Sequence, residues 1–240
     1  MDDEFKGLRG KLLSGRVYPE FFPLDSSDRV VNLGCGEGPQ AIVYAGTFGE
    51  MVGVDIQVEK LQRAEAALQV WGVHNVTLLQ ANVERTNLDE GSFDKALAID
   101  VVEHVEDPRR FCLEVARLLK PGGEVLLTFP TLHDKYIHLG SSVGRLLLRK
   151  KRKPAAGLGW DPSVHNQEHS VRDWIALVES CGLELWKSRA STLFPPLHAY
   201  GVPRFWFSSN LIHRVDSVFC RMPVLRNYGQ ALLCVFRTRA

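Results

Sequence analysis

The residues of this chain that could do chemistry begin with a glycine-dense turn at positions 34–39, which reads Gly-Cys-Gly-Glu-Gly-Pro. A β-branched apolar segment precedes the turn, and a predicted helix follows it. Asp55 ends the next apolar segment, 21 residues after Gly34. Glycines let the backbone approach a ligand closely, and a carboxylate at the end of a second strand accepts ribose hydroxyls. The spacing therefore predicts a site for a cofactor that contains a nucleoside.

Pro39 separates two classes of cofactor. A dinucleotide fingerprint, Gly-x-Gly-x-x-Gly, would have its third glycine at position 39, where this chain has Pro. A pyrophosphate needs free N–H groups at the start of the helix, and Pro removes one of them. S-adenosylmethionine carries no phosphate and tolerates this loss. In this run the chain resembles the class I S-adenosylmethionine-dependent methyltransferases, of the small-molecule type that includes the ubiquinone-biosynthesis O-methyltransferases.

The resemblance implies S-adenosylmethionine as the cofactor and S-adenosylhomocysteine as its product. It places the cofactor on Asn32, Gly34, Cys35, Gly36, Gly38, Asp55, Ile56, Asn82, Val83 and Asp100. The glycine turn would lie under the methionine part, Asp55 would accept both ribose hydroxyls, and Ile56 would pack on the adenine. Asn32 stands where the family usually has Asp. It keeps an acceptor oxygen and lacks the charge that attracts the ammonium of the cofactor.

Asn82 and Val83 follow the third predicted strand. In the family the first of these positions is often Asp, which reads the adenine amino group, and the N–H of the second meets a ring nitrogen. Asn82 can accept through its amide oxygen, or it can serve as a turn-forming residue. The sequence favours neither interpretation.

The run Asp100-Val101-Val102-Glu103-His104 is the second chemical feature. It follows the fourth predicted strand, where the switch-point rule places the methyl group of the cofactor. If a helical turn begins at Asp100, then Asp100, Glu103 and His104 share one face. Three interpretations stay open. The run only lines the pocket; or His104 is a general base for a substrate hydroxyl; or all three side chains bind a divalent cation that acidifies this hydroxyl.

The metal interpretation comes from the resemblance, because ubiquinone O-methyltransferases and small-RNA 2′-O-methyltransferases show Glu-x-x-Glu-His at this place. This chain has Asp for the first Glu, and His165 or His169 would supply a further ligand. Many relatives carry Glu-His here without a metal. We therefore take His104 as the catalytic candidate, assign no metal ligand and leave a divalent metal open.

Apolar segments that alternate with helical ones must position these residues. Strands are predicted at 29–33, 51–55, 76–80, 93–99, 124–129, 183–191 and 231–236, and helices at 39–47, 57–71, 107–119 and 170–181, the last with Ser170 as its N-cap. This alternation implies parallel strands joined by crossovers. The expected fold class is α/β, with a doubly wound, seven-stranded, mostly parallel, Rossmann-like sheet.

The length of 240 residues fits one domain, and we expect residues 1–240 to form a single methyltransferase domain. Its core would span about 25–130, 170–191 and 230–237. The rhythm of strands and helices breaks at about 131–169 and 192–229. These insertions would form a cap over the substrate.

The composition is that of an ordinary globular protein, with 45% hydrophobic and 24% charged residues. The five cysteines are scattered, without the spacing of a metal clip or a redox motif, and predict reduced thiols in a cytoplasmic protein. The acidic start Met1-Asp2-Asp3-Glu4 predicts no secretory signal. No apolar run reaches the roughly 18 residues of a transmembrane helix.

Charge is distributed unevenly, although the net value is only +1. Residues 1–139 carry 14 basic and 22 acidic side chains, whereas residues 140–240 carry 15 basic and 6 acidic ones. Arg145 and the five basic residues at 149–153 form a cluster. It is either a solvated loop, an interfacial helix that makes a peripheral contact with an anionic membrane, or a nucleic-acid clamp. The mild overall charge argues against nucleic acid as the partner.

The sequence thus predicts an enzyme that methylates a small-molecule or lipid-linked acceptor, with a hydroxyl oxygen as the leading candidate. N- or C-methylation stays open. Two other classes compete with this one: a non-catalytic relative that binds S-adenosylmethionine as a partner subunit, which Asn32 and Asn82 favour, and a nicotinamide oxidoreductase, which Pro39 disfavours. The acceptor and the oligomeric state do not follow from the sequence.

Overall fold

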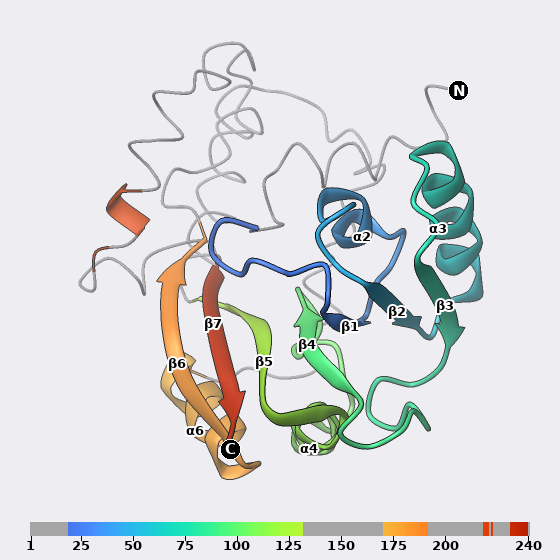
Figure 1. Cartoon of the computed structure of the whole chain (residues 1–240). Coiled ribbons are helices and arrows are strands. Elements are labelled where there is room, and N and C mark those ends of the chain that lie inside the picture. The colour runs from blue at the N-terminus through green and yellow to red at the C-terminus, as the bar shows by residue number, and fades with distance from the viewer. Residues whose placement is uncertain (1–18, 132–169, 192–217, 221, 223–230, 240) are drawn as a thin grey trace, which may run out of the picture.

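Residues 19–131, 170–191, 218–220, 222 and 231–239 are described by the computed structural model of the chain (Figure 1). The strands are β1 (Arg29–Leu33), β2 (Glu50–Asp55), β3 (Val76–Gln80), β4 (Phe93–Ala98), β5 (Leu119–Pro130), β6 (Leu183–Ala190) and β7 (Ala231–Thr238). The helices are α2 (Pro39–Val43), α3 (Val58–Val70), α4 (Pro108–Leu118) and α6 (Val171–Ser180).

The strands form one seven-stranded sheet with the order β3-β2-β1-β4-β5-β7-β6. The neighbours from β3 to β5 are parallel, whereas β7 runs antiparallel between β5 and β6. The direction of winding reverses between β1 and β4. Open α/β sheets bind ligands at such a switch point, outside the carboxyl ends of the strands.

Helices pack on both faces of this sheet. In Figure 1, α2 and α3 lie beside β1–β3, and α4 and α6 lie behind β4–β7. Phe111 and Trp174 join α4 and α6 to one face, and the Trp174 ring stacks on Phe129 with centroids 5.7 Å apart. Ile42 and Leu68 join α2 and α3 to the other face. Each large apolar side chain buried in this way contributes roughly 2 kcal/mol. The predicted doubly wound, mostly parallel, seven-stranded fold is confirmed.

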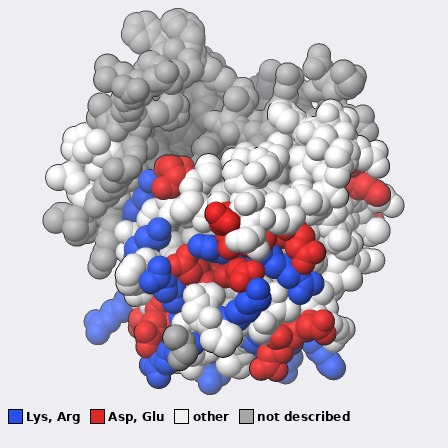
Figure 2. All heavy atoms as spheres, viewed as in Figure 1, with Lys and Arg blue, Asp and Glu red and all other residues white. Residues whose placement is uncertain are grey.

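Charged side chains gather over β4, β5 and β7, where basic and acidic groups are intermixed (Figure 2). Lys95 and Arg237 both pair with Glu124. Burial by itself raises the pKa of Glu124, but the hydrogen bonds from Lys95 and Arg237 outweigh it and hold that pKa below its usual value. The carboxylate therefore stays ionised and links three neighbouring strands.

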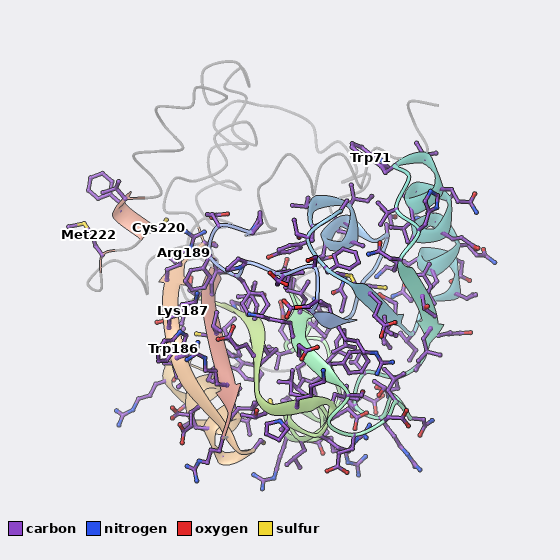
Figure 3. All side chains as sticks on the ribbon, in the orientation of Figure 1. Trp71, Trp186, Lys187, Arg189, Cys220 and Met222 are labelled. Atoms are coloured by element: carbon purple, nitrogen blue, oxygen red, sulfur yellow. The ribbon has the colours of Figure 1, made fainter. Side chains whose placement is uncertain are left out.

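Lys187 and Arg189 extend this charged area along β6 (Figure 3). The Lys187 Nζ donates to the Phe21 carbonyl oxygen at 2.7 Å and lies over the Phe21 ring, and Arg189 pairs with Glu20. Burial lowers the pKa of Lys187 below its usual value. These contacts fasten the first described residues to the far edge of the sheet.

Two predicted boundaries differ from the structure by more than two residues. The helix expected at 39–47 ends at Val43, because the chain turns and Gly46 adopts a left-handed φ of 78°. β5 begins at Leu119 rather than at 124, directly after α4, and bends at Gly122, where φ is 76°. Neither difference removes a predicted strand or helix.

Side chains cap the starts of α4 and α6, whereas α3 begins at Gln57 without a side-chain cap. The Asp107 carboxylate accepts the N–H groups of Arg109 and Arg110 at 3.0 and 3.1 Å. Ser170 forms a capping box with Asp173, so the predicted N-cap is confirmed. Caps of this kind contribute about 1 kcal/mol each. Asp107 also fixes the point where the loop after β4 becomes helical.

Several predicted features lie outside the described residues. They are the cluster of basic residues at 145–153, His165, His169 and, apart from residues 131, 218–220 and 222, the two cap insertions. The cap and its contact with an anionic membrane therefore stay predictions. Within the described ranges, no helix combines the length and the hydropathy that a membrane span requires.

Candidate functional site

The glycine turn connects the end of β1 to α2, at the switch point of the sheet. Gly34 has a left-handed φ of 69°. A Cβ on Gly34 would lie 2.6 Å from Val101 Cγ2, so the turn packs directly against the chain that follows β4. A side chain at this position would therefore clash, and the close approach of the two loops requires glycine.

Cys35 has its side chain turned into the protein, where it is 2% exposed. Its Sγ lies 3.1 Å from the point where a Cβ on Gly53 would stand, and its N–H donates to the Val54 carbonyl oxygen at 2.9 Å. The thiol thus fills the space beside a glycine of β2. The Cys35 carbonyl oxygen accepts the Gly38 N–H at 3.0 Å, so both backbone groups of Cys35 hold the turn in place.

Asp55 ends β2 beside the glycine turn and is 6% exposed. Its Oδ2 accepts the Gly36 N–H at 2.9 Å, and its Oδ1 accepts the Gln57 N–H at 2.9 Å. Each carboxylate oxygen offers about two acceptor sites. The carboxylate therefore ties the turn to β2 and still offers acceptor capacity on both oxygens, as the predicted ribose contact requires.

Asn32 lies in β1 and is 1% exposed. Its Nδ2 donates to Gln40 Oε1 at 3.3 Å, whereas its Oδ1 is buried and has no hydrogen-bond partner in the described part of the chain. A buried amide oxygen left in this state is costly, unless a ligand or water donates to it. The sequence reasoning missed Gln40. Its one signal is a polar residue in the first turn of an otherwise apolar helix, Pro-Gln-Ala-Ile-Val.

The predicted adenine contacts follow β2 and β3. Ile56 is 61% exposed directly after β2, so an apolar surface is available there. Val83 is partly buried and packs against the core. Asn82 Oδ1 accepts the Glu84 N–H at 2.8 Å, and the Asn82 carbonyl oxygen accepts the Arg85 N–H at 3.0 Å. Asn82 therefore has the turn-forming role that was one of its two interpretations.

The chain after β4 does not begin a helical turn at Asp100, so the condition for one shared face of Asp100, Glu103 and His104 is not met. Asp100 adopts a left-handed φ of 56°, which breaks the helical periodicity. Its N–H donates to Thr128 Oγ1 at 2.7 Å, and the Thr128 hydroxyl donates to Asp100 Oδ1 at 3.3 Å. The turn comes one residue later, where the His104 N–H donates to the Val101 carbonyl oxygen at 2.9 Å.

Glu103 and His104 differ in exposure. Glu103 is 4% exposed, whereas His104 is partly exposed. Of these two side chains, only that of His104 is therefore accessible enough to act as a base on a substrate. No three His, Cys, Asp or Glu side chains in the described ranges are grouped so that they could hold a metal ion. The further ligands considered above, His165 and His169, fall outside those ranges.

Comparisons with known proteins agree on one family. A family model described as a methyltransferase domain matches residues 31–127. The chain is 30% identical over 149 residues to a Bacillus subtilis protein named uncharacterized methyltransferase YcgJ, with 62% of this chain and 54% of YcgJ covered. It is 30% identical over 178 residues to the ubiquinone biosynthesis O-methyltransferase of Xanthomonas oryzae pv. oryzae, with 68% and 69% covered. The chain thus spans just over half of the first relative and about two thirds of the second.

One solved structure has a similar fold. It is a chain of the complex between the Haloferax volcanii Trm112 methyltransferase activator and a methyltransferase. The TM-score is 0.67 at 19% identity, and the match covers 100% of this chain and 95% of the other. At this identity the likeness concerns the fold alone.

Proposed function

Because the chain belongs to the class I S-adenosylmethionine-dependent methyltransferases, we propose that it transfers a methyl group to a hydroxyl oxygen of a small-molecule or lipid-linked acceptor. The observation that carries this proposal is the turn after β4, which presents a partly exposed His104 at the carboxyl edge of the sheet. The name of the Xanthomonas relative, an O-methyltransferase, supports oxygen as the methylated atom.

The residues around the glycine turn fit this cofactor. The tight approach of Gly34 to Val101 leaves backbone, rather than side chain, at the turn. We assign the ribose hydroxyls to Asp55, whose two oxygens keep acceptor capacity. We assign the ammonium to Asn32 Oδ1, a buried acceptor that such a donor would satisfy. The exposed side chain of Ile56 supplies an apolar surface for the adenine.

When bound, S-adenosylmethionine supplies a methyl group on a positively charged sulfur, which is already a good leaving group. The residues of the chain mainly have to align the acceptor and exclude water. An acceptor hydroxyl must also lose its proton. An imidazole is the side chain best suited to take up a proton near neutral pH, so we assign this proton to the His104 ring.

Transfer of a labelled methyl group tests the proposal directly. The protein is incubated with methyl-labelled S-adenosylmethionine and a host extract, and the products are separated into lipid, aqueous, protein and nucleic-acid fractions. The proposal expects label in the lipid fraction or in small molecules, bound through oxygen. Label in nucleic acid or on nitrogen or carbon would refute the acceptor class. Tight cofactor binding without any transfer would favour the non-catalytic alternative.

Two histidine variants test whether His104 is the base. His104→Gln should lower kcat by about 10²–10⁴-fold and leave the Kd of S-adenosylhomocysteine within about threefold. The matched control is His74→Gln, since His74 is exposed between α3 and β3. If His104→Gln keeps full activity, the side chain is not the base. Activity that chelation abolishes would instead support the metal interpretation.

A further inference from the structure

Asp100 has an unusual backbone conformation, with a positive φ. Among the described non-glycine residues, only Asn87 and Asp100 have a positive φ. This conformation is disfavoured for an L-residue, and such residues concentrate at functional sites, where the surrounding structure must hold them in place. Asn87 lies in an exposed loop, whereas Asp100 lies two residues after the end of β4, in the candidate site.

One buried hydroxyl makes two contacts with Asp100. Thr128 lies on β5 and is 2% exposed. Its Oγ1 accepts the Asp100 N–H at 2.7 Å and donates to Asp100 Oδ1 at 3.3 Å. A hydroxyl has one donor and two acceptor sites, so it can make both bonds at once. Because Thr is β-branched, few rotamers are open to it, and the hydroxyl is held in this direction.

The residues after Asp100 contact the glycine turn. Val101 is 7% exposed, and its Cγ2 lies 2.6 Å from the point where a Cβ on Gly34 would stand. The His104 N–H closes the next turn onto the Val101 carbonyl oxygen. A different φ at Asp100 would rotate the chain that follows. It would move Val101 away from Gly34 and take His104 with it.

We propose that Thr128 is a positioning residue, which holds Asp100 in its left-handed conformation and thereby sets the turn at 101–104 against the glycine turn. The inference rests on the proposed function, since it concerns how this cofactor site is formed before ligand binds. Without the hydroxyl, only a fraction of the molecules keeps the competent backbone. The apparent Kd of a ligand rises by the inverse of this fraction.

Calorimetric binding of S-adenosylhomocysteine measures this effect without any acceptor. Thr128→Val should raise the Kd about tenfold, the size expected when a buried N–H loses its acceptor. Thr128→Ser keeps the hydroxyl and should stay within about threefold of wild type. Thr238→Val is the matched control, because it removes a hydroxyl that donates to the Lys120 carbonyl oxygen at 2.7 Å, near the other end of β5. It should also stay within about threefold.

A second variant tests whether Thr128 acts through the backbone of Asp100. Glycine adopts a positive φ without steric cost. In an Asp100→Gly background, Thr128→Val should therefore change the Kd by less than about threefold. Hydrogen exchange gives an independent readout on the free protein: the Asp100 amide should exchange slowly in wild type and fast in Thr128→Val. If Thr128→Val does not fold, Thr128→Ala makes the same comparison.

The outcomes are distinct. Three results would overturn the proposal. The Kd could be unchanged in Thr128→Val, or it could rise as much in Thr128→Ser as in Thr128→Val. Thr128→Val could also raise the Kd as much in the Asp100→Gly background as in wild type. Each result would mean that the hydroxyl does not act by holding the φ of Asp100. If the protein binds S-adenosylhomocysteine but methylates no hydroxyl, the proposed function is wrong. The effect of Thr128→Val on binding would still be decided in that case.

Discussion

Gly34→Ala should destabilise the protein by roughly 2–5 kcal/mol, and this figure has two separable parts. An Ala at a φ of 69° carries a backbone cost of about 1–2 kcal/mol. The new Cβ would lie 2.6 Å from Val101 Cγ2, well inside the roughly 3.5–4.0 Å of a normal carbon contact. Relief of such overpacking costs about 1–3 kcal/mol more.

Gly46→Ala is the control that isolates the contact. Gly46 has a similar left-handed φ of 78°, but a Cβ there would meet nothing within 4 Å. Only the backbone cost of about 1–2 kcal/mol is expected. Urea unfolding of the two variants, compared at equal m-values, gives the difference. If Gly34→Ala is no more destabilised than Gly46→Ala, the added Cβ does not clash with Val101 as the 2.6 Å distance implies.

A double-mutant cycle tests the identity of the clashing group. In a Val101→Ala background the Cγ2 atom is absent, so Gly34→Ala should lose its overpacking cost and retain only the backbone cost. A coupling energy of about 1–3 kcal/mol is expected between the two positions. Additive free energies of unfolding would mean that another group opposes the new methyl. The Kd of S-adenosylhomocysteine should rise across the same variants in the order in which their stability falls.

Three further outcomes follow from single side chains. Asp55→Asn should weaken cofactor binding about 10–100-fold by calorimetry, since one of its two N–H acceptors becomes a donor; unchanged affinity would remove Asp55 from the ribose site. Asn32→Asp should lower the Tm of the free protein, because it buries a carboxylate at a 1% exposed position, and should increase the Tm shift that S-adenosylmethionine produces; an equal shift would place the ammonium elsewhere. Burial raises the pKa of Glu114, but hydrogen bonds from Arg117 and Thr86 hold it below the ordinary 4.5. The ionised group therefore stabilises the fold above pH 4.5, and Glu114→Gln should lower the free energy of unfolding by about 1–2 kcal/mol at pH 7. In urea unfolding repeated at lower pH, the difference between the variant and wild type should shrink, because the Glu114 carboxylate is then protonated.

Local patterns predicted the part of the site that is built from consecutive residues. The glycine turn and Asp55 stand at the ends of neighbouring parallel strands, and their type and spacing reflect that geometry directly. The mostly parallel sheet was predicted because alternating strands and helices permit few arrangements. Asn82 was left between two roles, and the structure shows its turn.

The remaining part depends on contacts between distant positions, which the local patterns of a single sequence do not reveal. Thr128 meets Asp100 across 28 residues, and nothing in the apolar run of β5 marks its hydroxyl as a partner. Gln40 meets Asn32 through the turn between them. The left-handed φ of Asp100 is likewise absent from the local pattern, since nothing in residues 100–104 marks this position as non-helical.

The central place of β7 in the sheet has a consequence for biosynthesis. β7 is the last described strand to leave the ribosome, yet it lies between β5 and β6. Until residues 231–238 emerge, the Glu124–Pro130 edge of β5 lacks its antiparallel neighbour, and β6 lacks the strand with which it pairs in the described sheet. An open edge of this kind recruits other chains. Until β7 is made, the nascent chain therefore carries an unpaired strand edge at which pairing with other chains competes with folding.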